Sequence, residues 1–187
     1  MIILSAGPVG LGSEAGTLLV DTALDLNPSS LIVDGAANTV ISGVISDSAV
    51  DSLIKSGLGT LTLTATNTYS GPTTVNGGTL LVNGPVANNN GPVDYDGTFN
   101  MTGGFLVAAG SAGMAQAPSN TSTQYALMHV FNQAQAAGTA VRIVSQDGEE
   151  IASFTPARMY QSIVVSSPKL VKGGTYLVYS GDETTMD

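Results

Sequence analysis

Residues 57–82, GLGTLTLTATNTYSGPTTVNGGTLLV, contain the pattern that decides the fold. The stretch has no charged residue, and it places Gly-Thr before an apolar pair at Gly59 and again at Gly78. A further Gly-Thr follows at Gly97, so both intervals are 19 residues long. A short strand repeated about every 20 residues is typical of a parallel β-solenoid, whose successive turns, or rungs, stack on one another. The sequence therefore predicts a stack of rungs.

The repeat also predicts which side chains stack inside the coil. Equivalent positions on successive rungs lie about 4.8 Å apart, and residues two positions apart in a strand share a face. We therefore expect two internal ladders and one external row of threonines. The internal ladders are Leu61, Leu80, Phe99 and Leu63, Val82, Met101, and the external row is Thr60, Thr79, Thr98.

Earlier strands follow the same pattern more loosely. GTLLV at 16–20 repeats GTLLV at 78–82, and the 43 residues from Gly16 to Gly59 correspond to about two rungs. Segments 30–35 and 38–46 supply further strands, and Asp-Gly and Asn-Gly pairs supply turns. We expect a right-handed parallel β-helix over residues 1–110. The alternative for such a Gly-rich chain is an antiparallel sandwich.

The composition narrows the function. Of 187 residues only 10% are charged, the net charge is -9, and the five basic residues cannot follow a phosphate backbone, so nucleic-acid binding is excluded. No apolar run reaches the about 18 residues that a membrane helix needs, and the first residues lack the basic start of a signal peptide. Absence of cysteine excludes a disulfide scaffold. This composition fits a secreted or bacterial cell-surface protein.

The last third of the chain has a different texture. After a small-residue linker at 110–122, strands are expected at 140–154, with a hairpin turn at Asp147-Gly148, and again at 161–180. Segment 124–137 fits either a helix, because it is rich in Ala, Leu, Met and Gln, or a strand, because its front half alternates. We expect residues 111–187 to form a β-rich module that caps the solenoid, whose N-terminal rung has no such cover and is therefore predicted to self-associate.

Two family resemblances follow from these segments. Residues 53–84, LIKSGLGTLTLTATNTYSGPTTVNGGTLLVNG, resemble the passenger-associated β-strand repeat of autotransporters, with ISGVIS just upstream. That resemblance implies a surface-displayed β-helix in which the repeat is structural. Residues 91–181 resemble the C-terminal part of bacterial carbohydrate-binding β-helix proteins related in fold to polysaccharide lyases. This second resemblance implies binding of plant polysaccharide, pectin- or cellulose-like, and an association with calcium.

Catalytic chemistry finds little support in the residues. With no Cys and a single histidine, His129, neither a nucleophilic triad nor a His-rich metal site can be assembled. A calcium-dependent polysaccharide lyase would need a basic residue to take a proton, and Lys55 is the only one before residue 111. We therefore assign no catalytic residue and expect a protein that is not an enzyme, with a lyase as the less favoured alternative.

Candidate binding residues lie on and beside the solenoid. Tyrosine rings cover apolar sugar faces and amides bind sugar hydroxyls. Asp94 and Asp96 are a close carboxylate pair, and they are either ordinary turn residues or ligands of a calcium ion. The candidates for carbohydrate binding are Tyr69, Tyr95, Asn67 and Asn76.

Two functions therefore stay open. The first is a non-enzymatic, secreted or cell-surface solenoid that binds polysaccharide, with calcium as the one candidate cofactor. The second is a purely structural passenger or stalk segment, or a recombined or engineered scaffold, without a ligand. Retardation in gels that contain pectin or cellulose derivatives distinguishes the two.

Overall fold

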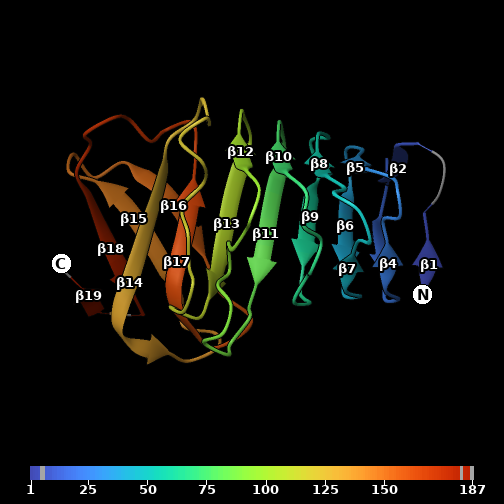
Figure 1. Ribbon diagram of the computed structural model, residues 1–187. Coiled ribbons are helices and arrows are strands. Elements are labelled where there is room, and N and C mark those ends of the chain that lie inside the picture. Colours follow the sequence, from blue (N-terminus) through green and yellow to red (C-terminus); the bar gives the residue numbers. More distant parts are fainter. Residues whose placement is uncertain (5–6, 182, 186–187) are drawn as a thin grey trace.

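The protein is an elongated all-β molecule in the computed structural model, which describes residues 1–4, 7–181 and 183–185. No helix occurs among these residues. Figure 1 shows the rungs standing side by side from β1 at the N-terminal end to β12 and β13, followed by a C-terminal module. The β-solenoid predicted from the sequence is confirmed.

Three parallel sheets form the sides of the solenoid. The first, in the order β1-β4-β7, contains β1 (Ile2–Ile3), β4 (Leu24–Asp25) and β7 (Ile45–Ser46). The second, in the order β12-β10-β8-β5-β2, contains β2 (Val9–Gly12), β5 (Leu31–Asp34), β8 (Leu53–Lys55), β10 (Thr73–Val75) and β12 (Phe99–Met101). The solenoid part of the third contains β3 (Thr17–Val20), β6 (Asn38–Ile41), β9 (Thr60–Leu63), β11 (Thr79–Asn83) and β13 (Phe105–Gly110). The five strands of the second sheet give about five turns.

Strand pairing confirms the part of the repeat on which the prediction rested. Leu61 pairs with Leu80 and Leu63 with Val82, a step of 19 residues. The two GTLLV segments lie in the same sheet, with β6 and β9 between them. Leu61 and Leu80 are buried, so the interior ladder forms where alternate apolar residues face the same side of stacked strands.

The third member of each predicted ladder is wrong. Phe99 pairs with Thr73 in the second sheet, whereas Leu80 pairs with Leu106 in the third. The chain between β11 and β13 is longer than in the preceding rung, so the step from Leu80 to Leu106 is 26 residues. Gly104, with φ +69°, occupies the turn position that Gly78, with φ +60°, holds one rung earlier. Gly97-Thr98 therefore leads into β12, and Thr98 is not part of the external threonine row.

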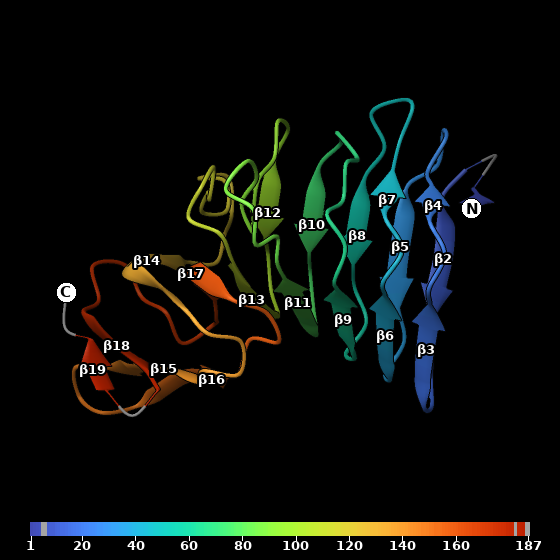
Figure 2. The same cartoon turned by 90° about the horizontal axis from the view of Figure 1, so that it is seen from below.

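The C-terminal module continues the third sheet and adds a fourth. β17 (Tyr160–Ser166) pairs antiparallel with β13, and β14 (Ala126–Gln135) pairs with β17. The segment that fitted helix or strand is therefore a strand. The fourth sheet, in the order β16-β15-β18-β19, contains β15 (Val141–Ser145), β16 (Glu150–Phe154), β18 (Tyr176–Ser180) and β19 (Glu183–Thr185). Figure 2 shows it beside the extension formed by β14 and β17.

The molecule has two hydrophobic cores. The first lies inside the solenoid and ends at Leu106, Ala108 and Val164. The second lies in the C-terminal module, where residues of β13, β14 and β17 such as Ala109 and Phe131 pack with residues of the fourth sheet. Successive residues of β13 and β17 thus serve different cores, because side chains alternate across a strand.

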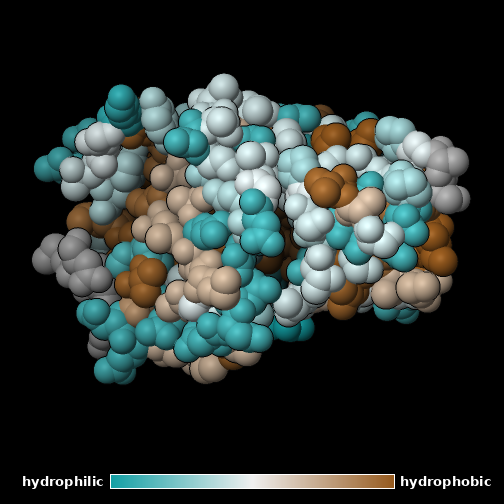
Figure 3. Space-filling model, in the orientation of Figure 1, coloured by the Kyte–Doolittle hydropathy of each residue, from teal (hydrophilic) through white to brown (hydrophobic). Residues whose placement is uncertain are grey.

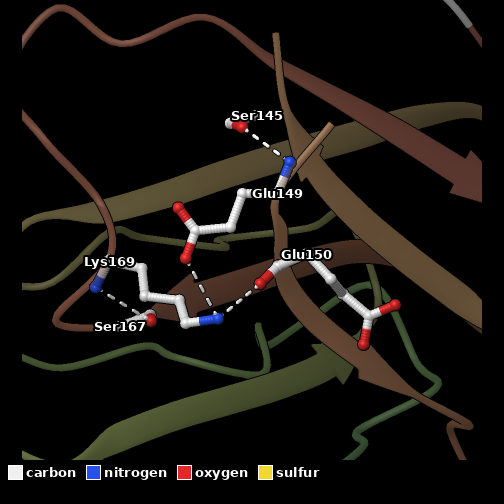
Figure 4. A network of polar contacts seen from close by, with 5 residues as sticks. All are labelled: Ser145, Glu149, Glu150, Ser167 and Lys169. Carbon is white, nitrogen blue, oxygen red and sulfur yellow. Dashed lines mark hydrogen bonds and ion pairs between the residues drawn. The ribbon is translucent and has the colours of Figure 1, made fainter. Parts of the chain in front are cut away.

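The predicted hairpin at Asp147-Gly148 joins β15 to β16. Its acidic tip is tied to the rest of the module (Figure 4): the Lys169 ammonium lies 3.2 Å from a Glu149 carboxylate oxygen and donates to the Glu150 carbonyl at 2.8 Å. Because both side chains of the ion pair are about half exposed, the pair fixes the hairpin's position more than it stabilises the fold.

Candidate functional site

The candidate site lies on the side of the solenoid where the first sheet stops. Beyond β7 the described residues continue this side of the solenoid as chain without strands. Segment 64–68 lies against β7, where the Asn67 side-chain oxygen accepts a bond from the Ile45 amide and the Thr68 amide donates to the Ile45 carbonyl, both at 2.9 Å. The Asn67 side chain thus bonds the free edge of β7 where a further strand would otherwise pair. In the part of the chain that the structure describes, the next two rungs have no strand on this side.

A cavity of about 80 Å³ opens between these two irregular rungs. The structure brings five of the six predicted site residues to its walls. They are Asn67, Tyr69, Asp94, Tyr95 and Asp96. The sixth, Asn76, lies at the turn between β10 and β11, where its side-chain oxygen accepts a bond from the Thr102 hydroxyl at 2.6 Å.

The two tyrosines of the cavity are fixed by internal hydrogen bonds. The Tyr69 hydroxyl lies 2.6 Å from the Thr73 hydroxyl. Burial raises the pKa of Tyr69 to about 12, although the bond to Thr73 lowers it. The Tyr95 hydroxyl donates to the Ala117 carbonyl at 2.9 Å. Both rings pack against the solenoid core, so each presents only part of its surface to the cavity.

The two aspartates follow a buried turn. Asp94 is half-buried and comes directly after Val93, which belongs to the solenoid core, and Asp96, two residues further on, is exposed. Among the residues that the structure describes, no group of three or more His, Cys, Asp or Glu side chains has the arrangement of a metal site. Calcium at Asp94 and Asp96 stays a prediction that would require main-chain oxygens.

Lys55, the basic residue that a lyase would have needed, is 1% exposed. Its ammonium donates to the carbonyl of Gly57 and, at 3.4 Å, to that of Gly77. Burial lowers the pKa of this lysine, and the Asp34 charge acts in the opposite direction. Lys55 thus closes a corner of the coil and does not line the cavity.

The single histidine lies outside the cavity. His129, on β14, packs edge-on against Phe131 with ring centroids 4.6 Å apart. It belongs to the C-terminal module and is not among the residues that line the cavity.

A set of hydrogen bonds caps the last rung, and the two serines that form it, Ser119 and Ser122, were not predicted from the sequence. The Ser119 and Ser122 hydroxyls accept bonds from the Phe99 and Met101 amides of β12, at 2.9 and 3.0 Å. The Ser119 and Thr123 amides donate back to the same two residues' carbonyls at 2.8 and 3.0 Å. The chain between β13 and β14, residues 111–125, is therefore an irregular further rung, in which serine hydroxyls replace strand carbonyls.

The other edge of the last rung is covered by β17. Five residues of β13 pair with it, from Leu106 with Ser166 to Gly110 with Ser162. Side chains reinforce the junction, because the Ser162 hydroxyl donates to the Ser111 carbonyl at 2.6 Å and the Ala157 amide donates to the Asn83 side chain at 3.1 Å. Both strand edges at this end of the solenoid are thus occupied.

Comparison with known proteins gives one match. The family model described as passenger-associated-transport-repeat matches residues 53–82, which include β8, β9, β10 and most of β11 and so belong to two successive rungs. No curated protein and no solved structure matches the chain. The matched repeat belongs to a passenger family and not to an enzyme family.

Proposed function

We propose that this chain is a structural, passenger-like segment of an extracellular or cell-surface protein, in which a C-terminal module ends a β-solenoid. The observation that carries the proposal is the double cap on the last rung: β17 on β13, and the serine hydroxyls of the linker on β12. The passenger-repeat match at residues 53–82 supports the same assignment. No helix in the described residues has the length and hydropathy to cross a membrane.

The cavity supports this structural role more than a binding role. A pocket that holds a small organic ligand usually has about 300–1,000 Å³, several times the 80 Å³ present here. Its tyrosine hydroxyls are engaged with Thr73 and Ala117. We therefore interpret the cavity as a gap between two irregular rungs and not as a ligand pocket.

Affinity electrophoresis tests the structural proposal. The purified chain should migrate equally in gels with and without pectin or cellulose derivatives, whether calcium or chelator is present. Concentration-dependent retardation would overturn the structural proposal. Protease accessibility on intact cells tests the location: cleavage of the segment without lysis is expected, and protection until lysis would contradict a surface position.

Polysaccharide binding is the second candidate, and one observation favours it. The cavity gathers Tyr69, Tyr95 and Asn67 with Asp94 and Asp96, a mixture of rings, amide and carboxylates that suits sugar contacts. Under this alternative, retardation in the polysaccharide gels should be lost in Tyr95→Ala and retained in Asn76→Ala, which lies outside the cavity. Retardation that both variants keep would contradict a sugar site in this cavity.

A further inference from the structure

One turn of the solenoid buries polar oxygens without a donor. It joins the first sheet to the second on two successive rungs, with Asp25 and Ser29 on one and Asp47 and Asp51 on the next. Asp25 pairs with Ser46, so Asp47 lies one residue beyond the level of Asp25. Ser29 and Asp51 are 1% and 7% exposed. In the described residues, one oxygen each of Asp25 and Asp51 and the Ser29 hydroxyl are buried without a hydrogen-bond partner.

The pairing of the flanking strands stacks the two turns. Leu31 pairs with Leu53, and the Ser52 and Ser30 hydroxyls are bonded at 2.7 Å, 22 residues apart. Ser29 therefore lies one rung below Asp51, at about the 4.8 Å spacing of neighbouring strands. A side chain at Gly71, one rung further, would collide with the Asp51 carbonyl. The backbone at Gly71 therefore packs directly against the turn at Asp51.

The charges at this corner are all negative. One Asp47 oxygen accepts bonds from the Asp51 and Ser70 amides, at 3.2 and 2.8 Å, and so holds the turn in place. Burial, and then the charges of Asp47 and Asp25, raise the pKa of Asp51. The one basic side chain of residues 1–110 is Lys55, and its ammonium is engaged with the carbonyls of Gly57 and Gly77.

We propose that this corner is a calcium site, in which one Ca²⁺ lies between the Asp25 and Asp51 carboxylates with the Ser29 hydroxyl as a further ligand. Because three or more acidic side chains do not converge as metal ligands in the described residues, backbone carbonyls must complete the shell. Ca²⁺ accepts six to eight oxygens in flexible geometry, whereas Mg²⁺ keeps several of its waters and suits a buried site less well. The site is distinct from Asp94 and Asp96 and independent of the structural role proposed above.

Terbium luminescence and thermal melts test the site together. The chain has no Trp, and the Asp47 charge acts on Tyr69, so Tyr69 is the expected sensitiser of Tb³⁺ bound at this corner. We expect Tyr-excited Tb³⁺ emission that Ca²⁺ displaces and millimolar Mg²⁺ does not. Ca²⁺ in roughly hundredfold excess over its dissociation constant should raise the melting temperature by several degrees.

Four variants locate the effect. Asp51→Asn and Asp25→Asn should lose the calcium shift, and in chelator both should melt no lower than the wild type, because they remove repulsion. Tyr69→Phe should lose emission but keep the calcium shift. Asp94→Asn, which removes a ligand of the other candidate calcium site, tells the two sites apart and should keep both signals.

Three results would overturn the proposal. One is a wild-type melting temperature that millimolar Ca²⁺ does not change. Another is a shift that Asp51→Asn keeps and Asp94→Asn loses. The last is stability that rises as the pH falls but ignores Ca²⁺, because the corner would then bind a proton only.

Discussion

The two ends of the solenoid are made of the same kinds of strand but differ in how far their core-facing side chains are buried. At the C-terminal end, Met101 and Leu106 are as fully buried as residues of the middle rungs. At the N-terminal end, Val9, Leu11 and Val20 point toward the core, beside buried Leu31, Val33 and Ile41, yet are only half-buried. Apolar atoms also gather at this end of the surface (Figure 3), where Ile3 is 58% exposed.

The difference shows that stacking alone does not finish a solenoid. Every rung offers its neighbour a row of amides and carbonyls, and the last rung must satisfy them otherwise or present them for association. Here an antiparallel strand covers one edge and serine hydroxyls cover the other. In the described residues β1, β2 and β3 are edge strands of their sheets, and we propose that this edge of the chain pairs with a second copy.

Removal of residues 111–187 should have the largest effect. It would uncover both edges of the last rung together with the Leu106 and Ala108 layer of the core, so we expect association or precipitation where the full chain stays in solution. Size-exclusion chromatography with light scattering measures this. A soluble monomer of residues 1–110 with a β-rich circular dichroism spectrum would show that the cap is dispensable.

Leu80→Asp should destabilise the solenoid core, which runs between the two ends. Leu80 is buried between Leu61 and Leu106, so the variant places an unpaired charge in the core and should cost about 3 kcal/mol or more. Denaturant unfolding measures the loss. Leu81→Asp, at the neighbouring half-buried position, should cost far less, and equal losses would contradict the assigned faces of β11.

Ser122→Ala should weaken the cap alone. It removes the acceptor of the Met101 amide, and an unsatisfied buried donor costs about 1–3 kcal/mol. The same unfolding measurement, with Ser48→Ala at an exposed turn position as control, isolates the effect. If both variants unfold at the same denaturant concentration, the serine bond contributes nothing to the cap.

Leu19→Lys should affect the open end with little loss of stability, because Leu19 is 70% exposed on the outer face of β3. A lysine on an edge strand discourages pairing with another chain, so sedimentation at increasing concentration should show weaker self-association than in the wild type. Leu58→Lys is the matched control, because Leu58 is 83% exposed in a middle rung, away from the open edge. A wild type that stays monomeric at all concentrations would contradict association through this rung.

The sequence predicted the stack well where the rungs were regular and poorly where they were not. Leu61 and Leu80 could be paired because a Gly-Thr turn precedes each strand by the same distance. Phe99 was misplaced because the longer connection between β11 and β13 brings a second Gly-Thr in front of a strand of another sheet. A local motif reports a turn but not which side of the coil follows it.

The site residues show the same limit. Tyr69 and Tyr95 come together because they lie one rung apart on the irregular side, whereas Asn76 lies at another corner. The acidic corner was missed because Asp25 and Asp51 are far apart in sequence, although the 22-residue step between Ser30 and Ser52 would have revealed it. Nor does composition show that Ser119 and Ser122 replace strand carbonyls, because that depends on where the linker crosses β12.

Residue-resolved hydrogen exchange tests the central claim, a solenoid capped at one end and open at the other, most directly. The Phe99 and Met101 amides, bonded to Ser119 and Ser122, should exchange as slowly as the Thr73 amide of the inner rung, which donates to Thr98 at 2.9 Å. Amides of β2 and β3 should exchange much faster, because the open rung frays. Fast exchange in β12, at the rate of β2, would contradict the cap, and equally slow exchange at both ends would contradict the open N-terminal rung.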